Sequence, residues 1–565
     1  MAERRNRRHF PRLSCRGIVC LSALASILAA PQKAQAGGFF IPDLGTEALG
    51  RGATFTAKAD DGTAFIYNVA GFARQRGTRL TLDLNIPFNS FTFTRTGKFP
   101  DKASDDTPWG GKPFPTVRNT AGPGVLPLLI VSSDLGMFDR LTFAAGVYPP
   151  SAIAGSTFPL GVEKAPAASR YDSVQGKGLI IYPSLGAAYR VLPWLDVGAA
   201  VHLVYGSFDQ VTLSYADQMA GQCATVEDYR CDARSNIVAK GMGFTGSLGV
   251  MARPKPEWQF GLNLLGPSTV KASGTAAATP PPITPNLMIK PGTAELEVKF
   301  PWVVRAGARY IQMDGKFELW DLEADLTLEG WGGAQTPGPT ATISNLGTYD
   351  TINAVSSHYY KNTLSLRLGG AYNFEELDGL FALRGGMFYD STASEPEYTR
   401  LDFDTLAKIG ATLGIGYKHG GVKVDFGYAA IASVPRHVEK GRVQPINGTK
   451  GGKPVDASGN PLPVVNNGDF AGFTHLISLG TTITFDAFFG GVKKPTFGDP
   501  DVEDLAGKEP PKKPGDGEEK KDEKKEEKPA AKPGEKPGEK PGQKTPETTP
   551  PTNPTSPSGC KWGEC

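Results

Sequence analysis

The chain has 565 residues, a formal net charge of +2, 69 glycines, 47 prolines and only 39% hydrophobic residues. This length suits about two to four ordinary domains or one large barrel. Because no apolar run of about 18 residues follows the N-terminal segment, the composition argues against a helical membrane protein.

Residues 1–36 have the three parts of a secretory signal peptide. Arginines dominate the start, an apolar stretch begins at Gly17, and the small-x-small sequence Ala34–Ala36 ends the segment. An uncleaved signal anchor is the alternative, but the apolar stretch is too short to span a bilayer. These residues carry seven Lys or Arg and one Glu, so their removal takes the formal charge from +2 to −4. An exported, mildly acidic chain is not typical of nucleic-acid-binding proteins.

Residues 37–76 are polar and rich in turn formers, and they precede the first regular strand signal. The adjacent carboxylates Asp60 and Asp61 open a short apolar run that ends at Asn68. From Arg79 onward, apolar residues alternate strictly with polar ones, which is the period of a β-strand. The sequence therefore predicts a separate compact segment in front of a long strand.

Alternation with period 2 recurs across residues 77–486 and predicts strands with one apolar and one polar face. One predicted strand runs from Leu296 to Tyr310 with apolar side chains at even positions, and another runs from Trp320 to Glu329. These strands exceed the usual length of about five or six residues in soluble sheets. Aromatic residues gather at strand ends, as in the girdles of outer-membrane barrels. The apolar faces are therefore expected to point outward, to lipid.

Short and long connections alternate along the chain, with the long ones near 97–123, 150–177, 216–234, 266–292, 330–360, 392–404 and 434–470. Short periplasmic turns and long external loops are typical of outer-membrane barrels. Lipid does not tolerate an open sheet edge, so the sheet must close. The sequence predicts an all-β fold, a membrane-spanning antiparallel barrel of about fourteen strands in the outer membrane of a Gram-negative cell.

The composition changes completely after Phe485. Residues 487–565 are rich in Lys, Glu and Pro and nearly free of large apolar groups, which predicts a disordered periplasmic tail. The tail is interpreted either as a tether towards peptidoglycan or another periplasmic partner, or as a solvated tail without a specific partner. The end of the last strand, Ser478–Phe485, resembles the sorting signal read by the barrel-assembly machinery, which makes that machinery an expected partner.

Four cysteines remain in the mature chain and form two close pairs, Cys223 with Cys231 and Cys560 with Cys565. An even number in an exported chain predicts two local disulfides. Neither pair has metal-ligand spacing or a nearby histidine, so no metal site is predicted.

No catalytic machinery is predicted either. His202 and His475 lie on predicted strands without a nucleophile motif around them. Gly241–Gly246 matches a GxGxxG pattern, but it lies inside a strand and no helix follows it. Neither enzyme activity nor a cofactor is expected.

Several segments, in their order and spacing, resemble the FadL family of outer-membrane transporters for long-chain fatty acids and other hydrophobic compounds. They include LGRGATFTAKADDGTAFIYNVAG, LTFAAGVYPPSA, FPWVVRAGARY and ALRGGMFYDSTASEP. The resemblance covers most of residues 37–485 and implies a fourteen-stranded barrel, residues 77–486, with an N-terminal hatch, residues 37–76, inside its lumen. The family's hatch usually carries Asn-Pro-Ala, whereas this chain has Asn68-Val69-Ala70. Loss of the fixed proline φ is expected to loosen that turn.

The resemblance implies passive transport of a hydrophobic ligand: capture by external loops, binding beside the hatch, and lateral release into the outer-membrane lipid. Release is expected at a gap in the third strand, Leu141–Pro150, where Gly146, Pro149 and Pro150 are suited to break the ladder; alternatively, the prolines simply end the strand. Phe39, Phe40 and Ile41 are expected either to contact ligand or to anchor the hatch. The second hypothesis is a structural protein that tethers the barrel through its tail.

Two interpretations of the hatch residues Asp60, Asp61, Asn68 and Ala70 stay open. They latch the hatch through bonds to backbone amides and lumen charges, or they cap local turns.

Charged residues on the polar strand faces predict a ladder of ion pairs along the lumen wall. Arg305 and Arg309 lie on one predicted strand, acidic residues from Asp321 to Asp325 on the next, and Arg367 on the one after. Binding of a substrate carboxylate by one of these arginines is the alternative interpretation.

Overall fold

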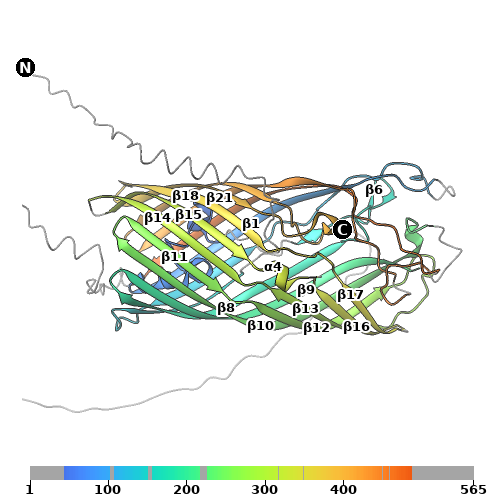
Figure 1. Cartoon of the computed structure of the whole chain (residues 1–565), viewed down its shortest axis with the longest axis horizontal. Helices are drawn as coiled ribbons and strands as arrows, with labels where there is room; N and C mark the ends of the chain where they lie inside the picture. Colours follow the sequence, from blue (N-terminus) through green and yellow to red (C-terminus); the bar gives the residue numbers. More distant parts are fainter. Residues whose placement is uncertain are drawn as a thin grey trace, which may run out of the picture. The chain divides into compact units, whose positions relative to one another are not determined.

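The computed structural model describes residues 44–101, 107–149, 155–216, 225–315, 317–336, 338–347, 349–447, 450–456 and 458–485. Fourteen long antiparallel strands close into a barrel, because β1 pairs with β22 on one side and with β3 on the other (Figure 1). The fourteen strands are β1 (Thr78–Arg95), β3 (Leu126–Ser133), β4 (Leu141–Tyr148), β8 (Gln175–Leu192), β9 (Leu195–Tyr215), β10 (Asp232–Lys255), β11 (Trp258–Leu265), β14 (Val303–Asp314), β15 (Phe317–Glu329), β18 (Thr363–Glu376), β19 (Gly379–Asp390), β20 (Lys408–His419), β21 (Val422–Val438) and β22 (Gly468–Thr484). The predicted strand number is confirmed.

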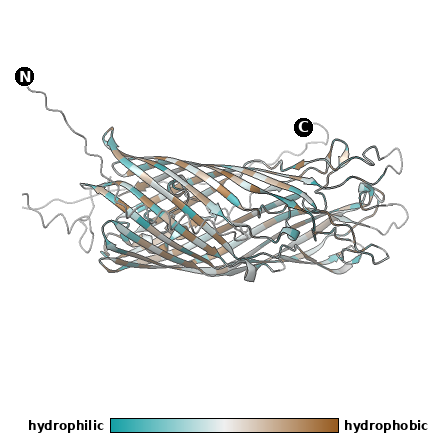
Figure 2. Ribbon diagram, turned by 45° about the horizontal axis from the view of Figure 1, so that its top comes forward, coloured by the Kyte–Doolittle hydropathy of each residue, from teal (hydrophilic) through white to brown (hydrophobic). Residues whose placement is uncertain are grey.

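The barrel strands alternate as the sequence predicts. On β11 the exposed side chains are Trp258, Phe260, Leu262 and Leu264, whereas Asn263 is buried in the lumen. Figure 2 shows apolar residues gathered on the half of the barrel that ends in short turns. Such a belt of outward apolar side chains is the surface that lipid covers.

Four further strands extend the barrel wall at its long-loop end: β12 (Ser268–Thr279), β13 (Gly292–Phe300), β16 (Thr340–Leu346) and β17 (Tyr349–Val355). β12 pairs with the first half of the 24-residue β10, and β13 joins β12 to β16. The segments 266–292 and 330–360, which the sequence predicts as loops, therefore contain strands. Proline and glycine interrupt the period-2 pattern in both segments, which is why the sequence predicts loops.

Two prolines separate this extension from the barrel. Leu265 is the partner of Val303 and Ser268 the partner of Phe300, so Pro267 and Pro301 stand opposite each other in one register. Neither has an N–H to donate, and the ladder breaks between them. The single strand predicted from Leu296 to Tyr310 is consequently two strands, β13 and β14.

The two faces of the sheet exchange polarity at these prolines. In the extension, Lys271, Glu295 and Lys299 point outward and are exposed, whereas Leu296 and Val298 are buried inside. The prediction that the even positions of residues 296–310 all face lipid is therefore wrong for β13. An apolar face turns inward where water lies outside, so the lipid-facing surface ends near Pro267 and Pro301.

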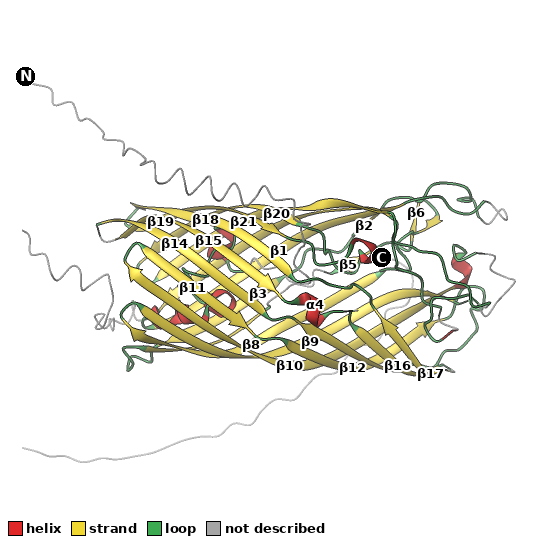
Figure 3. Ribbon diagram, viewed as in Figure 1, coloured by secondary structure: helices red, strands yellow, loops and turns green. Residues whose placement is uncertain are grey.

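A compact segment inside the barrel precedes β1. It contains α2 (Thr46–Gly50), α3 (Ala64–Tyr67) and the 3-10 helix η1 (Val69–Arg74), drawn in red within the strands in Figure 3. Almost all residues from 44 to 75 are buried. We refer to residues 44–76 as the hatch.

The remaining elements are short: β2 (Val117–Arg118), β5 (Ser156–Thr157), β6 (Gly161–Val162), β7 (Ala165–Pro166), η3 (Tyr229–Cys231), α4 (Trp331–Ala334) and η4 (Pro396–Tyr398). None of the helices in the described part of the chain is long and apolar enough to cross a membrane.

Candidate functional site

The hatch lies against glycines of the barrel wall. A Cβ atom on Gly369 would lie 1.8 Å from the carbonyl oxygen of Arg51, and one on Gly261 would lie 2.1 Å from that of Thr56. Only glycine allows two backbones to approach this closely. Five other wall glycines would also place a Cβ atom less than 3.0 Å from the hatch backbone: Gly198, Gly249, Gly386, Gly414 and Gly427.

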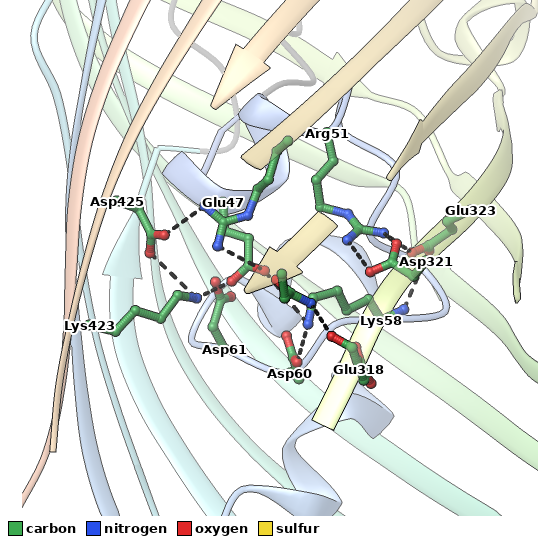
Figure 4. Close-up of polar contacts among 12 residues, drawn as sticks. Glu47, Arg51, Lys58, Asp60, Asp61, Glu318, Asp321, Glu323, Lys423 and Asp425 are labelled. Carbon is green, nitrogen blue, oxygen red and sulfur yellow. Dashed lines mark hydrogen bonds and ion pairs between the residues drawn. The ribbon is translucent and has the colours of Figure 1, made fainter. Parts of the chain in front are cut away.

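Arg51 fixes the hatch to β15 through two buried ion pairs (Figure 4). Its Nη2 atom lies 2.6 Å from Oδ1 of Asp321 and 3.2 Å from Oε2 of Glu323. Nη1 donates to Oδ2 of Asp321 at 2.9 Å, which makes that pair bidentate. The guanidinium is fully buried, so these carboxylates replace the water that it loses on folding.

The same stretch of β15 also binds the hatch backbone. One oxygen of Asp325 accepts from the amides of Phe55 and Thr56, at 2.9 Å each. Glu323 accepts from the amide of Ala57 at 2.7 Å. Three successive amides are thus satisfied by wall carboxylates, which holds residues 51–57 in place.

The predicted ladder of ion pairs along the lumen wall is confirmed for Arg309 and wrong for Arg305. Arg309 pairs with Asp321 at 2.8 Å. Arg367 pairs with Asp390 on β19 at 2.9 Å, and Oδ2 of Asp325 accepts from hatch amides. Among the described residues Arg305 has no ion pair, and its guanidinium lies 5.9 Å from the ring centre of Tyr67. The carboxylates of Asp321, Glu323 and Asp325 on β15 therefore bind mainly the hatch and not the neighbouring strands.

A second cluster of charges joins α2 to β19 and β21 near the short-turn end. Glu47 lies 3.4 Å from Arg384 and also pairs with Lys423. Arg384 and Lys423 in turn reach Asp425, at 2.8 and 3.4 Å (Figure 4). The sequence reasoning missed Glu47 and Arg51. One sequence signal could have identified them: both are charged residues in a segment that is expected to be buried inside the barrel lumen.

The two predicted aspartates of the hatch act locally. Asp61 accepts from the amide of Thr63 at 2.8 Å and from its hydroxyl at 2.5 Å, which caps the turn before α3. Asp60 is half exposed and pairs with Lys58. For these residues the structure favours turn capping and local pairing over contacts with the wall.

Asn68 both caps a turn and ties the hatch to the wall. Its Oδ1 accepts from the amide of Ala70 at 3.2 Å, and its Nδ2 donates to the carbonyls of Thr56 and Val250, both at 3.0 Å. The neighbouring amide of Val69 donates to Oδ1 of Asn263 on β11 at 3.3 Å. A proline at position 69 has no such donor, so the departure from Asn-Pro-Ala adds a contact with the wall.

Replacement of Asn68 by alanine is expected to lower the free energy of unfolding by about 2 kcal/mol, since a cap and two bonds to backbone carbonyls, one of them buried, disappear. Urea unfolding of the purified barrel measures this loss. The control is Asn353→Ala, which removes an exposed amide bonded to Thr342 at 3.1 Å. Equal losses in both variants would contradict the role of Asn68.

The wall is interrupted beside β3 and β4. Each of these strands has 8 residues, whereas the neighbours β1 and β8 have 18. Beyond them, β1 receives irregular bonds, from the amide of Asn119 to Phe91 at 2.8 Å and from that of Gly124 to Pro87 at 3.1 Å. A regular ladder is missing in this part of the described wall.

The interruption does not arise at Gly146. β4 pairs with β3 and with β8 without a register shift through this residue, so the expectation that Gly146 breaks the ladder is wrong. With no side chain, it allows close contact with Ile130 on β3, whose Cγ1 would lie 2.5 Å from a Cβ atom. Pro149 directly follows the last residue of β4, as a strand terminator does, and Pro150 lies outside the described residues.

A cavity of about 120 Å³ lies inside the extension. Its apolar lining comes from barrel strands, extension strands and loops: Phe208, Ile237, Leu296, Val298, Ala341 and Phe403. Its polar end contains Asp172, Arg400, Asp402 and Ser356. Arg400 donates to Asp172 at 2.7 Å, and Ser356 donates to Asp402 at 3.0 Å.

One continuous apolar cluster connects this cavity with the hatch. It includes Leu296 and Val298 at the cavity, then Phe300, Trp331 and Tyr360 at the boundary of the extension, and Phe65 and Tyr148 at the hatch. It also includes Leu128, Ile130 and Ala144 on the two short strands. The interior therefore offers apolar contacts from the long-loop end to the interrupted wall.

Several predicted residues lie outside the described part of the chain: Phe39, Phe40, Ile41, Cys223, Cys560 and Cys565, together with the signal segment 1–36 and the tail 487–565. Cys231 is buried and disulfide-bonded. Among the described residues, no group of three or more His, Cys, Asp or Glu is placed to hold a metal ion.

Comparisons with known proteins agree with this architecture. Residues 27–460 match the family model "Outer membrane protein transport protein (OMPP1/FadL/TodX)". No curated protein sequence matches the chain. Among solved structures, the chain is similar to a FadL homologue of Pseudomonas aeruginosa, with 17% identity, a TM-score of 0.63 and coverage of 80% of this chain and 100% of the other.

Two toluene transporters are also similar in fold. TbuX of Ralstonia pickettii has 16% identity and a TM-score of 0.54, with 79% of this chain and 99% of the other covered. TodX of Pseudomonas putida has 15% identity and a TM-score of 0.56, with 80% and 100% covered.

Proposed function

Because the chain belongs to the outer membrane protein transport family of FadL and TodX, and so is an outer-membrane barrel of that family, we propose that it carries hydrophobic molecules passively into the membrane through its interior. Capture takes place in the extracellular extension, passage follows the apolar cluster beside the hatch, and release is lateral, at β3 and β4. The observation that carries this proposal is the continuous apolar cluster from the cavity to these strands.

The extension suits capture from water. Its outer face is charged and its inner face is apolar, so it stands in water while offering a nonpolar interior. Transfer of an apolar molecule into such an interior gains about 0.8 kcal/mol for each buried CH₂ group. A wet channel provides no comparable gain, and a hydrophobic molecule would not concentrate in it.

The clamped hatch favours passage beside it over its displacement. Arg51, Glu47 and their partners are buried, and separating them exposes several uncompensated charges. Phe65 and Phe72 form an apolar edge of the hatch, with ring centres 4.8 Å apart. Cargo that moves along Phe65 reaches β4 without breaking an ion pair.

Lateral release is consistent with the interrupted wall between β1 and β8. A hydrophobic cargo that leaves there enters lipid directly and avoids the charged residues around Asp60 at the periplasmic end. Pro149 and Pro150 limit the length of β4 in this proposal, and Gly146 packs it tightly on β3. Phe39, Phe40 and Ile41 are proposed ligand contacts.

The barrel-assembly machinery is proposed to read the end of the last strand, Ser478–Phe485, and the tail is proposed to lie in the periplasm, where peptidoglycan or another periplasmic partner is its candidate contact.

The test is uptake of labelled oleate, a short fatty acid and toluene by a Gram-negative host that lacks its own transporter. Expression of the chain is expected to raise uptake of at least one compound. Ala144→Trp places a large side chain into the apolar cluster and is expected to reduce uptake about tenfold. Ala145→Trp, whose side chain points outward from the same strand, is the control. Equal uptake by both variants would reject release at β4, and no uptake at all by folded protein would reject transport of these cargoes.

A further inference from the structure

The cavity in the extension has the size of a single-ring compound. Its volume is about 120 Å³, and an apolar cavity of about 150 Å³ in another protein takes benzene. Phe208 and Ile237 reach it from barrel strands, and Leu296, Val298 and Ala341 from the extension. This volume and lining favour a compact ring over an extended acyl chain.

The polar end of the cavity is rich in hydrogen-bond acceptors. Asp402 accepts from the amide of Phe403 at 2.9 Å and from the hydroxyl of Ser356 at 3.0 Å, and Nε2 of His358 lies 2.9 Å from it. Asp172 accepts from Nε of Arg400 at 2.7 Å and from the amide of Leu401 at 2.8 Å. Each carboxylate retains lone pairs beyond these bonds, since two carboxylate oxygens offer about four acceptor sites.

The basic side chains at this end of the cavity are already paired, which disfavours an anionic guest. Arg400 is already paired with Asp172 and lies 3.9 Å from Asp402, and Nε2 of His358 lies 2.9 Å from Asp402, so the carboxylates of this cluster already occupy both basic side chains. Burial raises and the neighbouring His358 lowers the pKa of the Asp402 carboxyl, and the balance leaves it at about 2, so it is ionised at neutral pH. A guest carboxylate would meet this charge in a buried site, whereas a guest hydroxyl would donate to it.

We infer that this cavity is a binding site for neutral single-ring aromatic molecules, that it favours rings carrying a hydroxyl donor, and that it rejects aromatic and aliphatic carboxylates. The inference rests on the proposed function and narrows its cargo at the first binding step. Leu296, Val298 and Phe208 hold the ring, and the hydroxyl donates to Asp402 or Asp172.

The test measures binding of 4-fluorophenol and 4-fluorobenzoate, which share one ring, to the full chain in lipid nanodiscs by fluorine NMR. Empty nanodiscs correct for partition into lipid. The phenol is expected to bind about tenfold or more tighter than the benzoate, which corresponds to about 1.4 kcal/mol. Equal or tighter binding of the benzoate would overturn the inference.

Two pairs of variants locate the site. Ala341→Trp fills the cavity and is expected to abolish phenol binding, whereas Ala277→Trp, at an exposed position of β12, leaves it unchanged. Asp402→Asn removes one negative charge and is expected to bring the two affinities within about threefold of each other, about 0.7 kcal/mol. Asp404→Asn, which alters a nearby carboxylate bonded to Ser433, is expected to keep the tenfold preference.

Folded protein is verified by resistance of each barrel to unfolding in detergent. Phenol binding that persists in Ala341→Trp would place the site elsewhere and overturn the inference. If cells take up oleate in an Ala144-dependent manner but the cavity binds no phenol, the transport proposal stands and this inference fails. If the cavity binds phenol as described but no compound is taken up, the inference stands and the transport proposal fails.

Discussion

Arg51→Ala is expected to lower the free energy of unfolding by about 3–5 kcal/mol and to release the N-terminal part of the hatch. The substitution leaves Asp321 and Glu323 buried without the guanidinium that they compensate. Arg309 still reaches Asp321 at 2.8 Å, but the hatch then offers Glu323 only the backbone amides of Ala57 and Lys58. Most of the loss therefore comes from Glu323 and from the turn at residues 51–54.

Urea unfolding measures the stability loss, and single-channel conductance in planar bilayers reports a hatch that no longer fills the lumen. The control is Arg442→Ala, which removes an exposed pair with Glu397 whose side chains are 62% and 40% exposed. That change is expected to cost less than about 1 kcal/mol. If the two variants unfold alike, Arg51 does not hold the hatch.

The period-2 pattern predicted the barrel because each membrane strand shows its apolar and its polar face within its own sequence. Alternation alone does not say which face meets water, and this is why β13 was assigned the wrong orientation. Leu296 and Val298 alternate as residues of the lipid-facing strands do, but their neighbours Glu295 and Lys299 stand in water. Pro267 and Pro301 mark the change, and only their pairing in one register shows that they act together.

The hatch could be located from the sequence, but its attachment could not. Asp61 and Asn68 were found because turn chemistry is local, and their bonds to Thr63 and Ala70 are local as well. Arg51 and Asp321 are 270 positions apart, and no local pattern relates two such residues. The charges of β15 are visible in the sequence, but the strand pattern predicts their partners on neighbouring strands and not on the hatch.

Gly386→Ala is expected to destabilise the folded barrel by about 3 kcal/mol through a steric clash with the hatch. A Cβ atom at this position would lie 2.4 Å from the carbonyl carbon of Arg51 and 2.4 Å from the amide nitrogen of Gly52. Both atoms belong to backbone, and Arg51 is held by its ion pairs, so the hatch cannot yield without breaking them. The neighbouring Gly385 faces the other side of β19, where the nearest atom to an added Cβ is 4.0 Å away.

Gly385→Ala is therefore the matched control: it adds the same methyl group one residue away and is expected to change stability by less than about 0.5 kcal/mol. Urea unfolding of both variants separates steric exclusion by the hatch from any general effect of alanine on β19. The double variant Arg51→Ala with Gly386→Ala sharpens the comparison, because a hatch freed from its ion pairs has room to retreat. Its total loss is expected to fall below the sum of the single losses by about 1 kcal/mol or more, as coupled neighbours show. Strict additivity would mean that Gly386 and Arg51 act on the fold independently, and that the close fit of hatch and wall is not what confers stability at this position.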